Sequence, residues 1–439
     1  MLEKYQQSML EDICRLIKIP SVFEESSEYP FGANINRCLD EALDIMARLG
    51  FRTYKSPDNM YGYAEVGEGE LFGVLGHLDV VNARKEDGWE HDPFQPIIQG
   101  EYLCGRGTQD DKGPVMAAAY ALKSLLDDGF QLKKRVRFIF GIDEETLWRS
   151  IQAYKENEEA PASGFTPDST FPLTYAEKGL LQILIRSSEA FPIPCSGGDS
   201  FNAVSSHASC PRNDRIEQAL AILNLPHHVT ETEICVEGVT AHAKNPWKGV
   251  SANLNLLHAM YKAGYSNHAI DFACNVLDGK YRFEGFTDND LSDFSGPVTV
   301  NLGKIEGNEN GSVFSIDLRL PVGQKKEDIL ELIRKKASEY SLVVEEFDWL
   351  RPIHVPLDSP LVQNLLNAYQ DITGDTETEP YISAGATYAR AFDNCVAFGA
   401  NMPDTPTSEH QPNERVPISK LMKAAEVYRK AFEKLVIVK

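Results

Sequence analysis

The chain has 439 residues, of which 42% are hydrophobic and 25% are charged, and its formal net charge is −22. This length predicts two or three domains, and the composition is that of a globular protein. The acidic balance argues against nucleic acid and anionic membrane as partners, because both would be repelled. No apolar run reaches the ~18 residues of a membrane span.

Helix and strand patterns alternate from the N-terminus to about residue 185, as in an α/β fold. Residues 1–19 predict an amphipathic helix with acidic residues, unlike a signal peptide, which has a basic start and an apolar centre. The elements that follow in chain order are a helix at 35–50, a strand at 71–81, a helix at 112–129, a strand at 135–143 and a helix at 145–156.

From residue 186 the pattern changes to alternating strands interleaved with helices, which is typical of an antiparallel α+β domain. Strands are expected at 229–239, 298–307 and 313–322, and helices at 215–225 and 326–340. The earlier pattern returns with a helix at 361–372, a short strand at 395–400 and a long helix after Pro417. We therefore predict one α/β domain, a mixed sheet with helices on both faces, formed by 1–185 and 353–439, with the α+β domain of 186–352 inserted into it.

The eight cysteines are scattered along the chain without a CxxC pair. This usage is typical of free thiols in a reducing compartment, so we expect a cytoplasmic protein.

Acidic and histidine side chains occur where strands of the α/β domain end. Ligands of open α/β sheets bind beyond the carboxyl ends of the strands, where these loops fall. Taken singly, each motif is typical of a solvated surface, and His77 with Asp79 is also typical of a buried structural pair. The residues concerned are His77 and Asp79 in GHLD, Asp110 in GRGTQDDKG, Glu144 and Glu145 in GIDEET, Asp168 in FTPDST, and His410 in SEHQPNE.

Together these residues suit a two-metal hydrolytic site. Borderline divalent ions accept mixed histidine and carboxylate ligands, and a carboxylate can bridge two ions ~3.5–4 Å apart. The ions lower the pKa of a bound water toward ~7, and a carboxylate that binds no metal must then take the proton. Adjacent glutamates suit this division, because one can bind metal while its neighbour serves as the base.

In their order and spacing the motifs resemble the co-catalytic metallopeptidases related to carboxypeptidase G, aminoacylase and succinyl-diaminopimelate desuccinylase. The combination of GRGTQDDKGP, DEE, FTPDSTFPLTYAEKG and ATYAR is most similar to the bacterial dipeptidase V (Xaa-His dipeptidase) branch. The resemblance implies a catalytic α/β domain interrupted by an α+β lid, and a cis peptide bond at Asp110–Asp111.

The resemblance also implies a ligand set. His77, Asp110 and Asp168 would hold one metal ion, and Asp110 would bridge to a second ion. Glu145 and His410 would complete the second site.

Two further catalytic roles follow from the resemblance. Glu144 would be the general base. Asp79 would face the His77 ring, fix its orientation and raise its basicity.

The lid supplies candidates for substrate binding. His242, in GVTAHAKNPWKG, matches a family histidine that stabilises the tetrahedral oxyanion, although a surface-loop histidine is the alternative. Arg319, in FSIDLRLPV, matches a family arginine that contributes to substrate binding, although its alternation also allows a salt bridge with Asp317. The remaining substrate-binding candidates are Asn202 of the lid and Gly385, Ala386 and Thr387 of ISAGATYAR, a loop whose amides would receive the substrate carboxylate.

The resemblance implies a dipeptidase with two divalent ions, for which zinc is favoured over manganese or cobalt. A monomer is expected, because the 186–352 insertion is longer than the dimerisation domain usual in this family. One alternative is an N-acyl amino acid deacylase that uses the same metals. Another is a catalytically silent homologue acting as a metal-dependent binding or scaffold protein, although such a binder has no use for the unspent Glu144.

Overall fold

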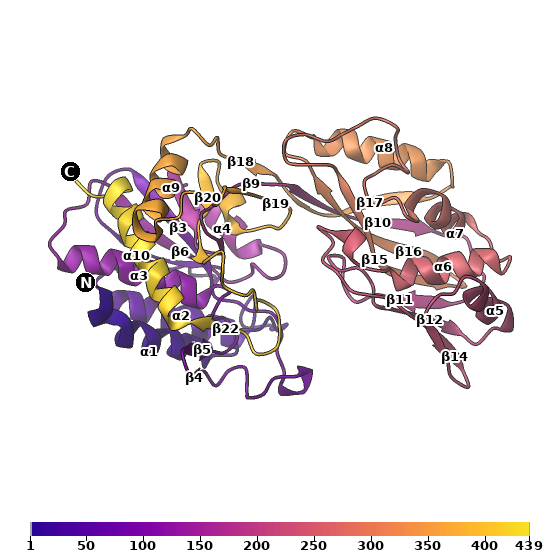
Figure 1. Ribbon diagram of the computed structural model, residues 1–439, viewed down its shortest axis with the longest axis horizontal. Coiled ribbons are helices and arrows are strands. Elements are labelled where there is room, and N and C mark those ends of the chain that lie inside the picture. The colour runs from indigo at the N-terminus through magenta and orange to yellow at the C-terminus, as the bar shows by residue number, and fades with distance from the viewer. Residues whose placement is uncertain (1, 439) are drawn as a thin grey trace. The chain divides into compact units, whose positions relative to one another are not determined.

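The computed structural model describes residues 2–438, which form two compact units (Figure 1). Unit 1 comprises Met1–Ala176, Ile353–Ile382 and Thr387–Lys439, and unit 2 comprises Glu177–Pro352 and Ser383–Ala386. Each unit has its own cluster of buried hydrophobic side chains. The predicted fold class, an α/β domain with an inserted α+β domain, is confirmed.

The domain boundaries differ in part from those expected. The predicted boundary at 185/186 falls inside strand β10 (Gly179–Ser187), and the structure divides the chain at 176/177 instead. The reason is that β10 pairs along its length with β16 (Gly311–Leu320), a strand of unit 2. The chain returns to unit 1 at 352/353, and the separate segment Ser383–Ala386 belongs to unit 2.

Unit 1 is built on a nine-stranded mixed sheet in the order β1-β2-β6-β3-β7-β20-β9-β18, with β19 also paired to β9. The central strands β6, β3, β7 and β20 run parallel to one another, whereas β2 pairs antiparallel with β6, and β9 pairs antiparallel with β20. The sheet strands are β1 (Arg52–Lys55), β2 (Gly62–Val66), β3 (Leu71–His77), β6 (Arg135–Gly141), β7 (Ser163–Thr166), β9 (Thr174–Glu177), β18 (Ile353–His354), β19 (Tyr381–Ser383) and β20 (Cys395–Ala397). Two small sheets pair β4 (Ile97–Gln99), β5 (Tyr102–Cys104) and β22 (Arg415–Pro417), and β8 (Ser169–Thr170) with β21 (Ala400–Asn401).

The helices of unit 1 pack their apolar faces on this sheet and on one another. In α1 the spacing of Met9, Ile13 and Leu16 puts all three on one face, and all three are buried. Helix α3 packs against α1 and α10. The unit 1 helices are α1 (Gln6–Ile17), α2 (Ala33–Arg48), α3 (Lys112–Asp127), α4 (Arg149–Asn157), α9 (Pro360–Thr373) and α10 (Ile418–Leu435), with short 3-10 turns η1 (Leu2–Tyr5), η2 (Lys85–Asp87) and η5 (Tyr388–Ala391).

Unit 2 is an eight-stranded sheet in the order β13-β14-β12-β11-β15-β16-β10-β17. Its described strand pairs are all antiparallel, as the alternating sequence pattern predicted. The strands besides β10 and β16 are β11 (Cys195–Gly197), β12 (His207–Pro211), β13 (His227–Val229), β14 (Glu233–Glu237), β15 (Thr299–Asn308) and β17 (Val343–Leu350). The helices are α5 (Asp214–Ile222), α6 (Ala252–Lys262), α7 (His268–Phe272) and α8 (Lys326–Ser338), with a 3-10 turn η3 (Pro246–Lys248) and a short π-helix η4 (Ala273–Leu277).

The burial of the strands explains why the two sheets have different patterns of hydrophobic residues in the sequence. Every residue of β3 is buried, so this strand is a continuous apolar run up to His77. Strand β10 instead alternates between buried and more exposed positions over its second half. Across residues 2–438, no helix is both long enough and apolar enough to cross a membrane.

Candidate active site

Four of the proposed site residues follow the carboxyl ends of three neighbouring strands. Strand β3 runs parallel to β6 and to β7, so the three carboxyl ends lie at one edge of the sheet. His77 is the last residue of β3, Glu144 and Glu145 follow β6, and Asp168 follows β7. The topology of the sheet therefore gathers these side chains.

Asp110 lies on the loop before α3 and faces two histidines. Its Oδ1 is 2.8 Å from His77 Nε2, and its Oδ2 is 2.9 Å from His410 Nε2. Asp168 Oδ2 lies 3.8 Å from His77 Nε2, and Glu145 Oε1 lies 3.0 Å from His410 Nε2. The five residues thus form two trios that share Asp110, an arrangement that suits a bridging carboxylate.

The contacts of Asp79 with its neighbours differ from those expected. His77 Nδ1 lies 2.9 Å from the Asp79 backbone carbonyl but 3.7 Å from the carboxylate Oδ1. The carbonyl, and not the carboxylate, therefore orients the ring, and a proton donated to it from Nδ1 leaves the Nε2 lone pair for a metal ion. The carboxylate Oδ2 instead accepts the Glu145 N–H at 3.0 Å. Asp79 thus positions one residue of each trio.

Glu144 and Glu145 lie on a loop, although the predicted helix began at Glu145. The helix α4 starts only at Arg149. Its delayed start follows from Asp143, whose carboxylate accepts the Arg149 N–H at 2.8 Å and the guanidinium at 2.8 and 2.7 Å. These bonds stabilise a turn that leaves both glutamates at the edge of the sheet.

Asp111 is a buried neighbour of the site to which the sequence interpretation gave no role. Its Oδ2 accepts the His77 N–H at 3.2 Å. Burial raises the pKa of Asp111 well above its ordinary value. The cis peptide bond implied at Asp110–Asp111 is present.

The electrostatics of the cluster favour positive ions. Burial, with repulsion from Asp110, raises the pKa of Glu144 and of Asp168 well above their ordinary values. Burial opposes a charged His77, but the hydrogen bond with Asp110, together with the negative charges of Asp110, Asp168 and Glu144, outweighs this and raises the His77 pKa. Burial also opposes an ionised Asp110, yet hydrogen bonds from His410 and His77 lower the pKa of Asp110. A cation among these carboxylates would remove the repulsion between them.

The donor set fits the two metal ions that the resemblance implies. Ligand atoms of His77, Asp110 and Glu145 all lie within 4.8 Å of one another. With Asp168 and His410, the cluster offers two imidazoles and three carboxylates, which is the mixed donor set of zinc, manganese or cobalt.

In unit 2, His242 and Asn202 lie on neighbouring segments. The Ala243 N–H donates to the Asn202 carbonyl at 2.8 Å, and Ala203 pairs with His242 in an antiparallel bridge. The Lys244 N–H donates to His242 Nδ1 at 3.0 Å. A neutral His242 ring therefore carries its proton on Nε2 and presents a hydrogen-bond donor there.

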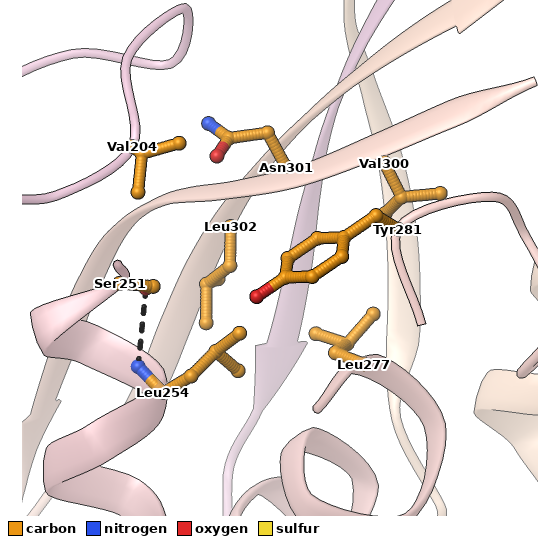
Figure 2. A pocket seen from close by; sticks show the side chains of 8 residues that line it. All are labelled: Val204, Ser251, Leu254, Leu277, Tyr281, Val300, Asn301 and Leu302. Atoms are coloured by element: carbon orange, nitrogen blue, oxygen red, sulfur yellow. Dashed lines mark hydrogen bonds between the residues drawn. The ribbon is translucent and has the colours of Figure 1, made fainter. Parts of the chain in front are cut away.

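Asn301, on β15, holds the segment that carries Asn202. Its side-chain nitrogen donates to the carbonyls of Phe201 and Ala203, both at 2.9 Å. Figure 2 shows Asn301 and Val204 among the residues that line a pocket of unit 2. The pocket contains no histidine or acidic side chain, and its lining residues are Val204, Ser251, Leu254, Leu277, Tyr281, Val300, Asn301 and Leu302.

Arg319 is buried, with 2% of its surface exposed. Its Nε and Nη2 donate to the Asp317 carboxylate at 2.7 and 3.0 Å, so the salt bridge left open by the sequence is present. Its Nη1 donates to the Ala384 carbonyl at 2.8 Å. Arg319 therefore holds the segment Ser383–Ala386, which explains why this segment belongs to unit 2.

The loop held by Arg319 is ordered by its own side chains as well. The Gly385 N–H donates to Ser383 Oγ at 2.9 Å, so it is engaged within the loop. Thr387 Oγ1 accepts the Ala389 N–H at 3.3 Å and caps the short helix η5. Ala386 lies between these two positions, next to the point where the chain returns to unit 1.

Comparison with known proteins adds sequence relatives over the whole chain. The family described as "Peptidase family M20/M25/M40" matches residues 73–434. A Staphylococcus epidermidis protein named "Putative dipeptidase" is 32% identical over 466 residues, which cover 99% of this chain and 98% of that protein. A Staphylococcus aureus protein of similar name is 33% identical over 468 residues, with the same coverage.

Solved structures show the same fold. Human carnosine dipeptidase 1 aligns with a TM-score of 0.62 at 17% identity, over 99% of this chain and 97% of that chain. Aminoacylhistidine dipeptidase from Vibrio alginolyticus aligns with a TM-score of 0.55 at 14% identity, over 97% of this chain and 96% of that chain. The sequence relatives and the fold agree with the resemblance that the motifs indicated.

Proposed function

Because the chain belongs to peptidase family M20/M25/M40, we propose that it hydrolyses the peptide bond of dipeptides at a site holding two divalent metal ions. The observation that carries this proposal is the Asp110 carboxylate, whose two oxygens face His77 and His410. A carboxylate shared in this way suits two ions rather than one. The eight free cysteines support a reducing, cytoplasmic environment.

His77, Asp110 and Asp168 would hold one ion, and Asp110, Glu145 and His410 would hold the other. Zinc is the favoured ion, with manganese or cobalt as the alternatives for this donor set. Such ions, when bound, polarise the scissile carbonyl and lower the pKa of a water molecule.

Glu144 is the proposed general base. Its neighbour Glu145 is engaged with His410 and with Asp79, which leaves Glu144 as the acid of the DEE motif to move a proton. The Glu144 carboxylate would take the proton of the attacking water and deliver it to the leaving amine.

His242 is the proposed donor to the developing oxyanion. The Lys244 N–H on Nδ1 supports this role, because it favours the tautomer with a proton on Nε2. Asn202, on the neighbouring segment, is proposed to contact the substrate.

Arg319, Gly385, Ala386 and Thr387 are proposed to recognise the substrate carboxylate. Because Asp317 and the Ala384 carbonyl engage three donor atoms of Arg319, we assign its main contribution to the shape of the loop that it holds. Because the Gly385 N–H already donates to Ser383, the other backbone amides of that loop would then meet the carboxylate.

The direct test is hydrolysis by the purified chain after removal of metal with a chelator and addition of Zn²⁺, Mn²⁺ or Co²⁺. Dipeptides should be cleaved fastest, and only with added metal. Faster release from N-acyl amino acids would instead identify a deacylase. Two tightly bound metal ions without hydrolysis of any substrate would identify a catalytically silent homologue.

Substrate length and oligomeric state form a linked prediction. His242, Asn202 and Arg319 all belong to the inserted unit 2 of the same chain. Because the insertion that carries them is also longer than the dimerisation domain usual in this family, we expect a monomer in light scattering, with tripeptides cleaved much more slowly than dipeptides. A stable dimer, or equal rates for the two lengths, would contradict the prediction.

A further inference from the structure

We propose that Glu414 and Gln109 are positioning residues for the metal site, a role that rests on the proposed function. They lie on the two loops that carry the metal ligands Asp110 and His410. Each side chain reaches across to the backbone of the opposite loop, and we call this pair of interactions the Glu414–Gln109 clasp.

The first half of the clasp is the Glu414 carboxylate. Its side chain has no exposed surface, and it accepts the N–H of Gln109 at 2.8 Å and that of Gly107 at 3.1 Å. The Arg106 guanidinium donates to it at 2.7 Å and thereby balances its charge. A fully buried carboxylate with several donors on one loop fixes the backbone of that loop.

The second half of the clasp is the Gln109 side chain, which bonds to the backbone of the loop that carries His410 and Glu414. Gln109 Nε2 donates to the Pro406 carbonyl at 3.1 Å, and Gln109 Oε1 accepts the Ser408 N–H at 2.8 Å. Gln109 directly precedes Asp110, and His410 lies between Ser408 and Glu414. Asp110 thus directly follows the clasp contacts of its loop, and His410 lies between those of its own loop.

The backbone conformation of His410 requires such support. His410 has φ +59° and Gly107 has φ +96°, both in the left-handed region. This region is costly for a residue with a side chain, and it persists where surrounding contacts hold it. At Gly107 a Cβ atom would lie 2.9 Å from Lys112 Cδ, so the loop also approaches α3 too closely for a larger residue.

Asp110 and His410 meet at 2.9 Å although they are far apart in the sequence. His410 is half exposed, with 51% of its side-chain surface accessible, so packing alone does little to fix its ring. The clasp holds the two loops in the relative position at which both side chains can reach one metal ion.

The test replaces Glu414 by glutamine. Glu414→Gln removes the charge that faces Arg106 and places an amide where Gly107 and Gln109 need an acceptor. The affinity of the weaker-bound Zn²⁺ should fall by about 10–100-fold, the usual cost of losing a residue that orients a ligand. Competition with a chromophoric chelator measures this affinity on the full chain.

A second measurement does not depend on metal. Hydrogen exchange of the Gly107 and Gln109 amides in the chelator-treated chain should be faster in Glu414→Gln than in the wild type. Gln109→Ala tests the other half of the clasp while leaving the Glu414–Arg106 pair intact, and it should weaken Zn²⁺ binding in the same direction.

Glu65→Gln is the matched control. Glu65 also pairs with a buried arginine of unit 1, Arg137, at 2.8 Å, and it contacts none of the proposed ligands. This variant should bind Zn²⁺ as the wild type does. An equal loss of affinity in Glu65→Gln would overturn the proposal, because the effect would then be general destabilisation.

Wild-type affinity for Zn²⁺ in a folded Glu414→Gln variant would also overturn the proposal. If Glu414→Gln does not fold, Gln109→Ala decides: weaker Zn²⁺ binding supports the clasp, and unchanged binding overturns it. Failure of the proposed function gives a different result, namely a wild-type chain that binds no divalent ions, while the amide-exchange comparison still tests the contacts of the clasp.

Discussion

Replacing Glu144 by glutamine should lower kcat by at least ~10²–10⁴, the range for losing a general base, while both metal ions stay bound. The substitution preserves the shape of the side chain and removes its ability to take a proton. Glu144 follows β6 beside Glu145, and the ion pairs of His77 and His410 with the proposed ligands are made by Asp110, Asp168 and Glu145. Metal analysis beside steady-state kinetics on the purified variant measures both effects.

Glu145→Gln is the matched comparison, because the same chemical change is made one residue away. Glu145 Oε1 lies 3.0 Å from His410 Nε2, so this variant should lose occupancy of the site shared with His410. Excess metal should then restore part of its activity. Loss of metal from Glu144→Gln with full occupancy in Glu145→Gln would show that the two roles are reversed. Unchanged activity in both variants would refute the proposed hydrolase activity.

Replacing His242 by alanine should lower kcat by roughly 10²–10³, the usual cost of removing one donor to an oxyanion. The structure supports this expectation through Lys244, whose N–H occupies Nδ1 and leaves the proton on Nε2. Metal content should not change, because His242 belongs to unit 2, whereas the proposed ligands belong to unit 1.

His228→Ala provides the control for this prediction. His228 is another exposed histidine of unit 2, and it pairs with Glu237 at 3.1 Å. It should retain wild-type kcat. A His242→Ala variant with normal kcat would show that His242 is an ordinary loop histidine.

Part of the proposed metal site follows from signals that are local in the sequence. The continuous apolar run of β3 ends at His77, and the apolar run of β6 ends just before the DEE motif. Histidine and carboxylate side chains at such ends are the ligand types that divalent metals prefer. Neither signal depends on contacts between distant segments.

The contacts that position those residues could not be predicted, because they join segments distant in sequence. The Asp79 carboxylate accepts the Glu145 N–H, yet Asp79 lies only two residues from His77, and that proximity suggested the ring as its partner. Glu414 was given no role from the sequence, yet its carboxylate is buried against Arg106. A carboxylate that accepts backbone N–H groups from a distant segment has no characteristic residue spacing in the sequence.

The start of α4 shows how a side chain can override helix propensity. The segment Glu145–Glu156 has apolar residues at helical spacing, which favours a helix from its first residue. Asp143 accepts the Arg149 N–H and guanidinium, and this local alternative delays the helix by one turn. The strand-to-helix loop that results is the place where both glutamates lie.

The attachment of Ser383–Ala386 to unit 2 limits how the inserted domain can be exchanged between homologous genes. The chain passes between the units four times, at 176/177, 352/353, 382/383 and 386/387. In a recombinant with a foreign 177–352 segment, Arg319 would come from one parent and Ala384 from the other. The hydrogen bond from Arg319 to the Ala384 carbonyl would then join residues that did not evolve together. The transferable module is therefore two separate stretches of coding sequence, and we expect substitutions in 383–386 to follow those around Arg319 as relatives diverge.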